Sequence, residues 1–204
     1  YSRKHGSGKN ILLDFLQTYV FGDRVTFYTA GLETVLEKHN HLLKNKKVVI
    51  VDELASSSDK FISNFDKLKS IMTGPFLTIN PKGTNQFLLK NVLAWFLISN
   101  HDDCIRMEPT DRRYFCLEVS ESKVGNKSYF KELGATFNQA LGDLFYSYVI
   151  RRGESKIVNI RIPPITKLKQ SMINRGLNTS LKFLGQLRKE EYIDDDSTLA
   201  GMEL

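Results

Sequence analysis

Residues 48–53 read Val48-Val49-Ile50-Val51-Asp52-Glu53, four β-branched apolar residues followed directly by two acids. A continuous apolar run of this kind is typical of a strand that is buried on both faces, as in a parallel sheet. Such a strand delivers the residues that follow it to the carboxyl edge of the sheet, where open α/β folds bind their ligands. The stretch therefore predicts an α/β fold with a mainly parallel sheet, and it makes Asp52 and Glu53 candidate site residues.

Helical and extended patterns alternate on both sides of this strand, which also favours the α/β class. Apolar residues at helical spacing predict helices over 10–21, 32–43, 61–72, 129–150, 166–173 and 181–187. Apolar runs predict further strands over 24–28, 92–98 and 114–119, and residues 75–89 form a β-hairpin pattern. We expect a core over residues 1–150, and a small C-terminal helical subdomain with an acidic tail over residues 151–204.

A glycine-rich segment, Gly6-Ser7-Gly8-Lys9-Asn10, stands immediately before the first predicted helix. It matches the later part of the phosphate-binding pattern G-x-x-x-x-G-K-[ST], in which backbone N–H groups cradle phosphates and the lysine reaches the β- and γ-phosphates. Two positions depart from the pattern, because Arg3 stands at the first glycine and Asn10 stands at the Ser or Thr that binds Mg²⁺. An amide oxygen can also coordinate Mg²⁺, so the segment predicts a site for ATP and Mg²⁺. A flexible Gly-Ser-Gly turn is the alternative interpretation.

The acidic pair after the strand suits the same chemistry. Asp52 lies far enough along the chain from Lys9 for one or two intervening α/β elements. In that place Asp52 would hold Mg²⁺, directly or through water, and Glu53 would polarise the attacking water as a general base. A strand that ends in a solvated acidic turn is the alternative.

Two further polar sites follow the predicted strand over 92–98. Asn100 stands at its end and could reach the γ-phosphate and the attacking water. Asp111 is followed by Arg112 and Arg113, and an arginine supplied across a subunit interface could stabilise charge in phosphoryl transfer. The alternatives are a Ser-Asn turn and a salt bridge within residues 111–113, and the sequence does not choose between the two arginines.

Composition narrows the class of protein. The 204 residues carry a net charge of +6, which suits contact with a polyanion but also serves solubility. The two cysteines have no metal-binding spacing and suit a reducing, intracellular compartment. No run of roughly 18 apolar residues occurs, so we expect no membrane span. The chain starts at Tyr1 and runs straight into the glycine-rich segment, which indicates a piece of a longer protein.

The order of these motifs resembles the superfamily 3 helicases, and most of all the viral, phage and plasmid primase–helicases of the poxvirus type. The resemblance covers most of the chain to about residue 185 and implies a P-loop NTPase fold of the AAA+-like kind, with a β-hairpin insertion and a C-terminal helical extension. The matching stretches are Gly6-Ser7-Gly8-Lys9-Asn10, Val49-Ile50-Val51-Asp52-Glu53, residues 67–74, Ile98-Ser99-Asn100, Asp111-Arg112-Arg113-Tyr114 and Ile162-Pro163-Pro164-Ile165-Thr166.

The resemblance implies an ATP-dependent DNA helicase for DNA replication, which moves along single-stranded DNA as a ring, most often a hexamer. In the full-length protein it implies an upstream primase domain. Arg112 or Arg113 would reach the neighbouring subunit's site, and Lys82 at the hairpin tip would contact DNA phosphate. The ATP site of one subunit would be formed by Gly6, Ser7, Gly8, Lys9, Asn10, Asp52, Glu53 and Asn100, with Mg²⁺ at Asn10 and Asp52.

Two other readings remain open. One is another P-loop ATPase of nucleic acid, such as a loader or a packaging motor. The other is a nucleic-acid-binding or oligomerisation module with a decayed nucleotide site, and Arg3 and Asn10 are the residues that keep this reading open.

Overall fold

A three-stranded parallel sheet forms the centre of the protein. The computed structural model describes residues 1–54, 59–155 and 162–176. The strand order is β1 (Thr26–Thr29), β2 (Val48–Val51) and β5 (Ala94–Leu97), and both pairings are parallel. All four residues of β2 are buried, because it is the middle strand and both of its faces are covered. The predicted α/β fold with a parallel sheet around residues 48–51 is confirmed.

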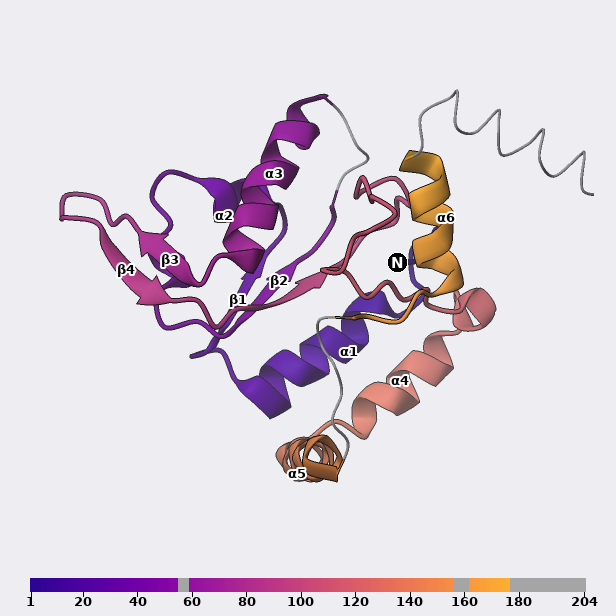
Figure 1. Ribbon diagram of the computed structural model, residues 1–204. Helices are drawn as coiled ribbons and strands as arrows, with labels where there is room; N and C mark the ends of the chain where they lie inside the picture. The colour runs from indigo at the N-terminus through magenta and orange to yellow at the C-terminus, as the bar shows by residue number, and fades with distance from the viewer. Residues whose placement is uncertain (55–58, 156–161, 177–204) are drawn as a thin grey trace, which may run out of the picture.

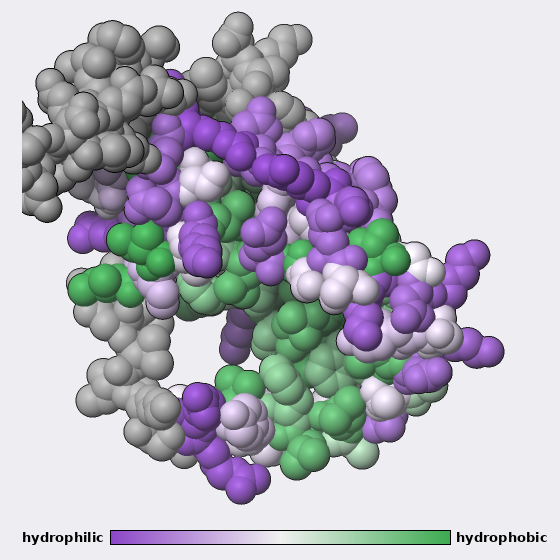
Figure 2. Space-filling view, turned by 90° about the vertical axis from the view of Figure 1, so that its right-hand side faces the viewer, coloured by the Kyte–Doolittle hydropathy of each residue, from purple (hydrophilic) through white to green (hydrophobic). Residues whose placement is uncertain are grey.

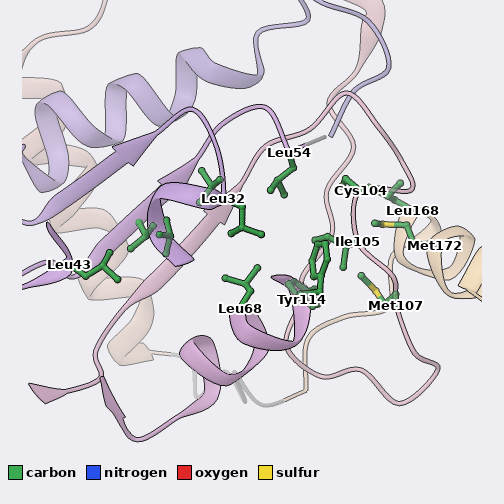
Figure 3. Packing of buried hydrophobic residues seen from close by; sticks show 14 of the residues in the cluster. Leu32, Leu43, Leu54, Leu68, Cys104, Ile105, Met107, Tyr114, Leu168 and Met172 are labelled. Carbon is green, nitrogen blue, oxygen red and sulfur yellow. The ribbon is translucent and has the colours of Figure 1, made fainter. Parts of the chain in front are cut away.

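Helices cover both faces of the sheet, so that α3 and α1 lie on opposite sides of it (Figure 1). Val49 and Val51 belong to a large core with α2, α3 and α6, part of which is drawn in Figure 3. Val48 and Ile50 belong to a second core with α1, η1 and α5. The bounds are α1 Lys9–Phe15, η1 Leu16–Phe21 (a π-helical continuation of α1), α2 Glu33–Leu36, α3 Asp59–Thr73, α5 Gln139–Ser155 and α6 Lys167–Gly176.

Backbone hydrogen bonds extend the sheet beyond β5. The Ser2 N–H donates to the Ser99 carbonyl at 3.4 Å, the Tyr1 amino group donates to the Leu117 carbonyl at 3.0 Å, and the Val119 N–H donates to the Tyr1 carbonyl at 2.8 Å. The start of the chain therefore lies between the end of β5 and residues 117–119. It leads into α1 on one face, whereas β2 leads into α3 on the other face. This reversal is the kind of switch point at which open α/β sheets bind ligands.

The predicted β-hairpin between β2 and β5 is confirmed as β3 (Phe76–Ile79) and β4 (Phe87–Lys90), which pair antiparallel. The hairpin projects from the end of the molecule opposite α6 (Figure 1). The turn end of β3 is tied to residues 38–40. The Asn40 side-chain amide donates to the Thr78 carbonyl at 2.9 Å and accepts from the Asn80 N–H at 2.9 Å, and the Asn80 side chain donates to the Lys38 carbonyl at 3.0 Å.

These hydrogen bonds explain why the helix predicted over 32–43 is wrong. The segment forms only α2 and a short 3₁₀-helix, η2 (His41–Leu43). Between them the chain leaves helical geometry at Glu37, and Asn40 binds the hairpin. Tertiary bonding here outweighs local helical propensity.

The long helix predicted over 129–150 is divided into α4 (Lys127–Ala135) and α5. The Thr136 hydroxyl donates to the Leu133 carbonyl at 2.7 Å, and the Asn138 side chain accepts from the Leu141 N–H at 2.9 Å. Ser, Thr and Asn side chains of this kind compete with helical bonding and cap new helices. The break therefore follows from local side-chain chemistry. One further short 3₁₀-helix, η3 (Glu121–Lys123), precedes α4.

The strand predicted over 114–119 is also wrong. Apart from the bonds to Tyr1, the carbonyl groups of this segment accept hydrogen bonds from side chains of α6 and of Thr166, the residue that precedes α6. The buried Lys169 ammonium donates to the Tyr114 carbonyl at 2.9 Å, and the Thr166 hydroxyl donates to the Cys116 carbonyl at 2.7 Å. These side chains take up carbonyl groups that a neighbouring strand would otherwise bind.

The division after residue 150 stays a prediction. Residue 150 falls within α5, and α6 contributes to the large core. The helix expected over 181–187 and the acidic tail lie outside the described residues. None of the helices that the structure describes is long and apolar enough to span a membrane.

The close packing of α5 on η1 gives a stability test. A Cβ atom added to Gly142 would lie 2.1 Å from the Tyr19 carbonyl oxygen, whereas one added to Gly153, also in α5, would meet nothing within 4 Å. We expect Gly142→Ala to lower the free energy of unfolding by about 1–3 kcal/mol, because the helix must move away. Gly153→Ala should raise it by up to about 1 kcal/mol through helix propensity. Chemical denaturation measures both, and equal effects would contradict the packing described.

Candidate functional site

The glycine-rich segment forms a turn that depends on two left-handed glycines. Gly6 has φ 71° and Gly8 has φ 88°, in the region that L side chains rarely adopt. A Cβ atom at Gly8 would also lie 2.5 Å from Cε1 of Phe130 in α4, so a side chain there would have to displace that ring. Ser7 is buried, and within the described residues its hydroxyl has no hydrogen-bond partner. A tight glycine turn with a spare hydroxyl is suited to an anion such as phosphate.

The turn places Lys9 against the end of β5. Its ammonium donates to the Asn100 side-chain oxygen and to the Lys4 carbonyl, the latter at 3.4 Å. Burial lowers the pKa of Lys9, while the charge of Asp52 acts in the opposite direction. Two residues predicted from separate motifs are thus in direct contact.

Asp52 is almost fully buried and receives three hydrogen bonds. Its Oδ2 accepts from the Asn10 amide nitrogen at 2.5 Å and from the Tyr28 hydroxyl at 2.5 Å, and its Oδ1 accepts from the Glu53 N–H at 2.9 Å. Burial, and next the bond to Asp52, raise the pKa of Tyr28 to about 12, so its hydroxyl stays protonated at neutral pH. Asn10, Tyr28 and Asp52 form one connected group, which we call the Asp52 cluster.

A second carboxylate lies close to the Asp52 cluster. Asp14 follows Asn10 by one turn of α1. Burial, and next the charge of Asp52, raise the pKa of Asp14. The edge of the sheet therefore combines the ammonium of Lys9 with two carboxylates that lie near each other.

Glu53 stands next to this cluster in an unusual backbone conformation. It is exposed and has φ 57°, a left-handed value for a residue other than glycine. The neighbouring bonds hold it there, because the Leu54 N–H donates to the Ile98 carbonyl at 2.9 Å and the Ser99 hydroxyl donates to the Leu54 carbonyl at 2.6 Å. Strained residues of this kind gather at functional sites.

The residues present fit a magnesium ion that is shared with a phosphate ligand. Within residues 1–54, 59–155 and 162–176, no group of three or more His, Cys, Asp or Glu side chains could hold a metal alone. Mg²⁺, however, commonly takes one or two carboxylates, the oxygens of its phosphate ligand and several waters. Asp52 offers the carboxylate, and the amide oxygen of Asn10 is the end of that side chain that does not donate to Asp52.

The other predicted site residues take no part in the hydrogen bonds that Lys9 and Asp52 form with the described residues. Arg112 is exposed and has no ion pair or hydrogen bond with the described parts of the chain. Arg113 binds Asp111 through Nε at 2.9 Å and Nη2 at 2.5 Å. The salt bridge considered for residues 111–113 is therefore present for Arg113. Lys82 is exposed in the turn of the β3–β4 hairpin. Arg3, at the position of the absent first glycine, pairs with Asp102 at 3.2 Å.

Sequence reasoning missed Tyr28, Asp14 and Phe130. Tyr28 lies opposite Ile50 in the β1–β2 register, two residues short of the level of Asp52. The strand pattern over 24–28 could have suggested that its long side chain reaches the sheet edge. The contact of Phe130 with the glycine turn carries no signal in the sequence.

A cavity of about 360 Å³ is lined by residues of α3, β5 and α6 and of the chain between residues 104 and 117, and none of Lys9, Asn10, Asp52 or Asn100 lines it. It is largely apolar, and two polar atoms on its walls, Nε1 of Trp95 and the hydroxyl of Tyr114, have no partner within the described residues. Its other lining residues include Leu54, Leu97, Cys104, Ile105, Cys116, Leu168 and Met172. No member of the Asp52 cluster therefore lines this cavity.

Comparison with known proteins places the chain in a family. It belongs to the family of unknown function DUF5906, whose model matches residues 1–113. It is also related to the DNA primase-polymerase of Nitratiruptor phage NrS-1, with 26% identity over 163 residues. That match covers 76% of this chain but only 21% of the phage protein.

Solved structures of the NrS-1 C-terminal region share the fold. An apo structure of that region has a TM-score of 0.68 at 20% identity, covering 86% of this chain and 42% of the other. Its A form has a TM-score of 0.65 at 19% identity, covering 94% and 46%. The mixed α/β arrangement described above is thus found in a phage protein as well.

Proposed function

We propose that this member of the DUF5906 family is the ATP-driven motor part of a DNA helicase that acts in phage DNA replication. The observation that carries the proposal is the meeting of Lys9 with Asn100 and of Asn10 with Asp52 at one edge of a parallel sheet. Such a meeting of a glycine turn, a lysine, a carboxylate and an amide fits a P-loop NTPase fold of the AAA+-like kind.

Each residue then has a defined task at the phosphates of ATP. Lys9 binds the β- and γ-phosphates, and Asp52 with Asn10 holds Mg²⁺, which neutralises charge on the phosphate oxygens when bound. Glu53 takes a proton from the attacking water, and Asn100 orients that water and the γ-phosphate. The Lys9 ammonium has three N–H donors and gives two of them to Asn100 and the Lys4 carbonyl, so one remains for a phosphate oxygen.

The ring assembly, a hexamer in this proposal, is supported by two surface features. Arg112 is exposed and unpaired within the described residues, so it is free to enter the ATP site of a neighbouring copy. The helix α5 exposes Leu144, Val149 and Ile150. Hydrophobic side chains also gather in the lower part of the face drawn in Figure 2. Exposed apolar side chains are a kind of surface that protein interfaces commonly bury.

The relative suggests the wider context. Its name is DNA primase-polymerase, and this chain corresponds to about a fifth of its length. In this proposal a primase or polymerase part lies upstream in the same protein, and the motor supplies it with single-stranded template. DNA would pass along the hairpins, where Lys82 contacts phosphates.

A nucleic-acid-binding module with a decayed nucleotide site is the second candidate. The ion pair of Arg3 with Asp102 favours this second candidate, because Arg3 stands at the position of the first glycine of the phosphate-binding pattern. A loader or packaging motor would share the ATP site but need no strand separation. The experiments below distinguish these functions.

The ATP site is tested by hydrolysis with and without single-stranded DNA. We expect Mg²⁺-dependent turnover that DNA stimulates. Lys9→Ala should abolish ATP binding, and Glu53→Gln should keep binding but lower kcat by about 10²- to 10⁴-fold, the usual contribution of a general base. Glu37→Gln, an exposed change away from the site, is the control. Full turnover in Lys9→Ala would contradict the assignment, and DNA binding without turnover in the wild type would favour the decayed module.

The hairpin is tested by its salt-dependent grip on single-stranded DNA. We expect Lys82→Ala to weaken binding and to reduce the slope of log K against log salt by about 0.7, the value of one phosphate contact on a single strand. Lys131→Ala, an exposed change on α4, should leave the slope unchanged. Titrations at several salt concentrations measure this, and equal losses in both variants would argue against a role for the hairpin.

The shared site is tested by mixing inactive subunits. Arg112→Ala and Glu53→Gln should each be inactive alone. In a mixed ring, an Arg112→Ala subunit still has Glu53 in its ATP site, and a neighbouring Glu53→Gln subunit still has Arg112. Where the two meet, one complete ATP site forms, so part of the ATPase activity should return. Arg113→Ala should remain active alone, because Arg113 is bound to Asp111 of its own chain. The idea fails if no mixture of assembled subunits regains activity.

A further inference from the structure

We propose that Tyr28 is a positioning residue of the ATP site, and that its hydroxyl supplies at Asp52 the hydroxyl group that the chain lacks at position 10. This inference rests on the proposed ATP site. It concerns how the Mg²⁺-binding group is held, and it assigns a role to a residue outside the motifs.

Position 10 carries an amide where the phosphate-binding pattern has a hydroxyl. In G-x-x-x-x-G-K-[ST], the Ser or Thr after the lysine brings a hydroxyl to Mg²⁺. Asn10 occupies that place here, and its amide nitrogen is bound to Oδ2 of Asp52 at 2.5 Å. A hydroxyl nevertheless reaches the same carboxylate oxygen, because the Tyr28 hydroxyl donates to it at 2.5 Å.

The strand pairing explains why a tyrosine of β1 can take this part. Tyr28 pairs with Ile50, so its Cα lies two residues before the level of Asp52, and a phenol ring is long enough to cover that interval. The pairing continues past the strands, because the Asp52 N–H donates to the Thr29 carbonyl at 2.8 Å. Donor and acceptor therefore stand on two strands that are hydrogen-bonded to each other.

The surroundings of Asp52 show what the bond does. Within the described residues, Asp52 forms no ion pair with a lysine or arginine, and its 9% exposure leaves little room for water. Its orientation is therefore set by three donors, namely the Asn10 amide, the Tyr28 hydroxyl and the Glu53 N–H. Hydrogen bonds to a metal-binding carboxylate fix its orientation, and their loss typically costs 10- to 100-fold in metal affinity.

The first test measures binding and not turnover. A fluorescent ATP analogue is titrated onto the full chain at increasing Mg²⁺, and anisotropy reports the bound fraction. We expect Tyr28→Phe to require about 10- to 100-fold more Mg²⁺ for half-maximal binding. Nucleotide binding without Mg²⁺ should be unchanged, which also shows that the variant is folded. Tyr146→Phe, which removes the hydroxyl of an exposed tyrosine in α5, is the matched control.

The second test restores a hydroxyl at position 10. In the Asn10→Ser background we expect Tyr28→Phe to change the Mg²⁺ requirement by less than about threefold, because the serine now supplies the group; such a double-mutant cycle isolates the coupling between the two positions. An unchanged Mg²⁺ requirement in Tyr28→Phe, or an equal penalty in both backgrounds, would overturn the inference and leave the ATP site standing. If the wild-type chain binds no nucleotide, the proposed function is overturned and this inference with it.

Discussion

The parallel pairing of β2 with β1 and β5 is the constraint on which the candidate site depends. Because the three strands run in the same direction, their carboxyl ends meet at one edge. The Asp52 N–H binds the Thr29 carbonyl at 2.8 Å and the Leu54 N–H binds the Ile98 carbonyl at 2.9 Å, so the pairing continues beyond the strands. The residues that carry chemistry stand on this continuation, and their mutual positions follow from the backbone.

This constraint explains how much of the site the sequence predicts. Asp52 and Asn100 follow apolar runs, so a local pattern combined with the geometry of a parallel sheet is enough to place them at one edge. Lys9 needs only the glycine turn before its helix. Tyr28 is different, because its contact with Asp52 depends on strand register and on the length of a side chain. No spacing rule in the sequence expresses that dependence.

The same distinction separates the fold predictions. The central strand, the hairpin and α3 are predicted from local sequence patterns, and the structure confirms all three. The predictions for residues 32–43 and 114–119 are wrong because side chains form hydrogen bonds with backbone groups that are distant in the sequence. Lys169 is fully buried, and its ammonium donates hydrogen bonds to the carbonyls of Asp111 and Tyr114. The Asn40 amide donates to the Thr78 carbonyl in the hairpin. Hydrophobic periodicity contains no information about such bonds.

The tie between Asn40 and the hairpin has a mechanical consequence. Residues 38–40 belong to the connection that leaves β1, the strand that also carries Tyr28. A displacement of the turn end of β3 must break the bonds to Lys38 and Asn40 or carry that connection with it. These bonds and the covalent connection therefore join the hairpin to β1, the strand whose Tyr28 hydroxyl donates to Asp52.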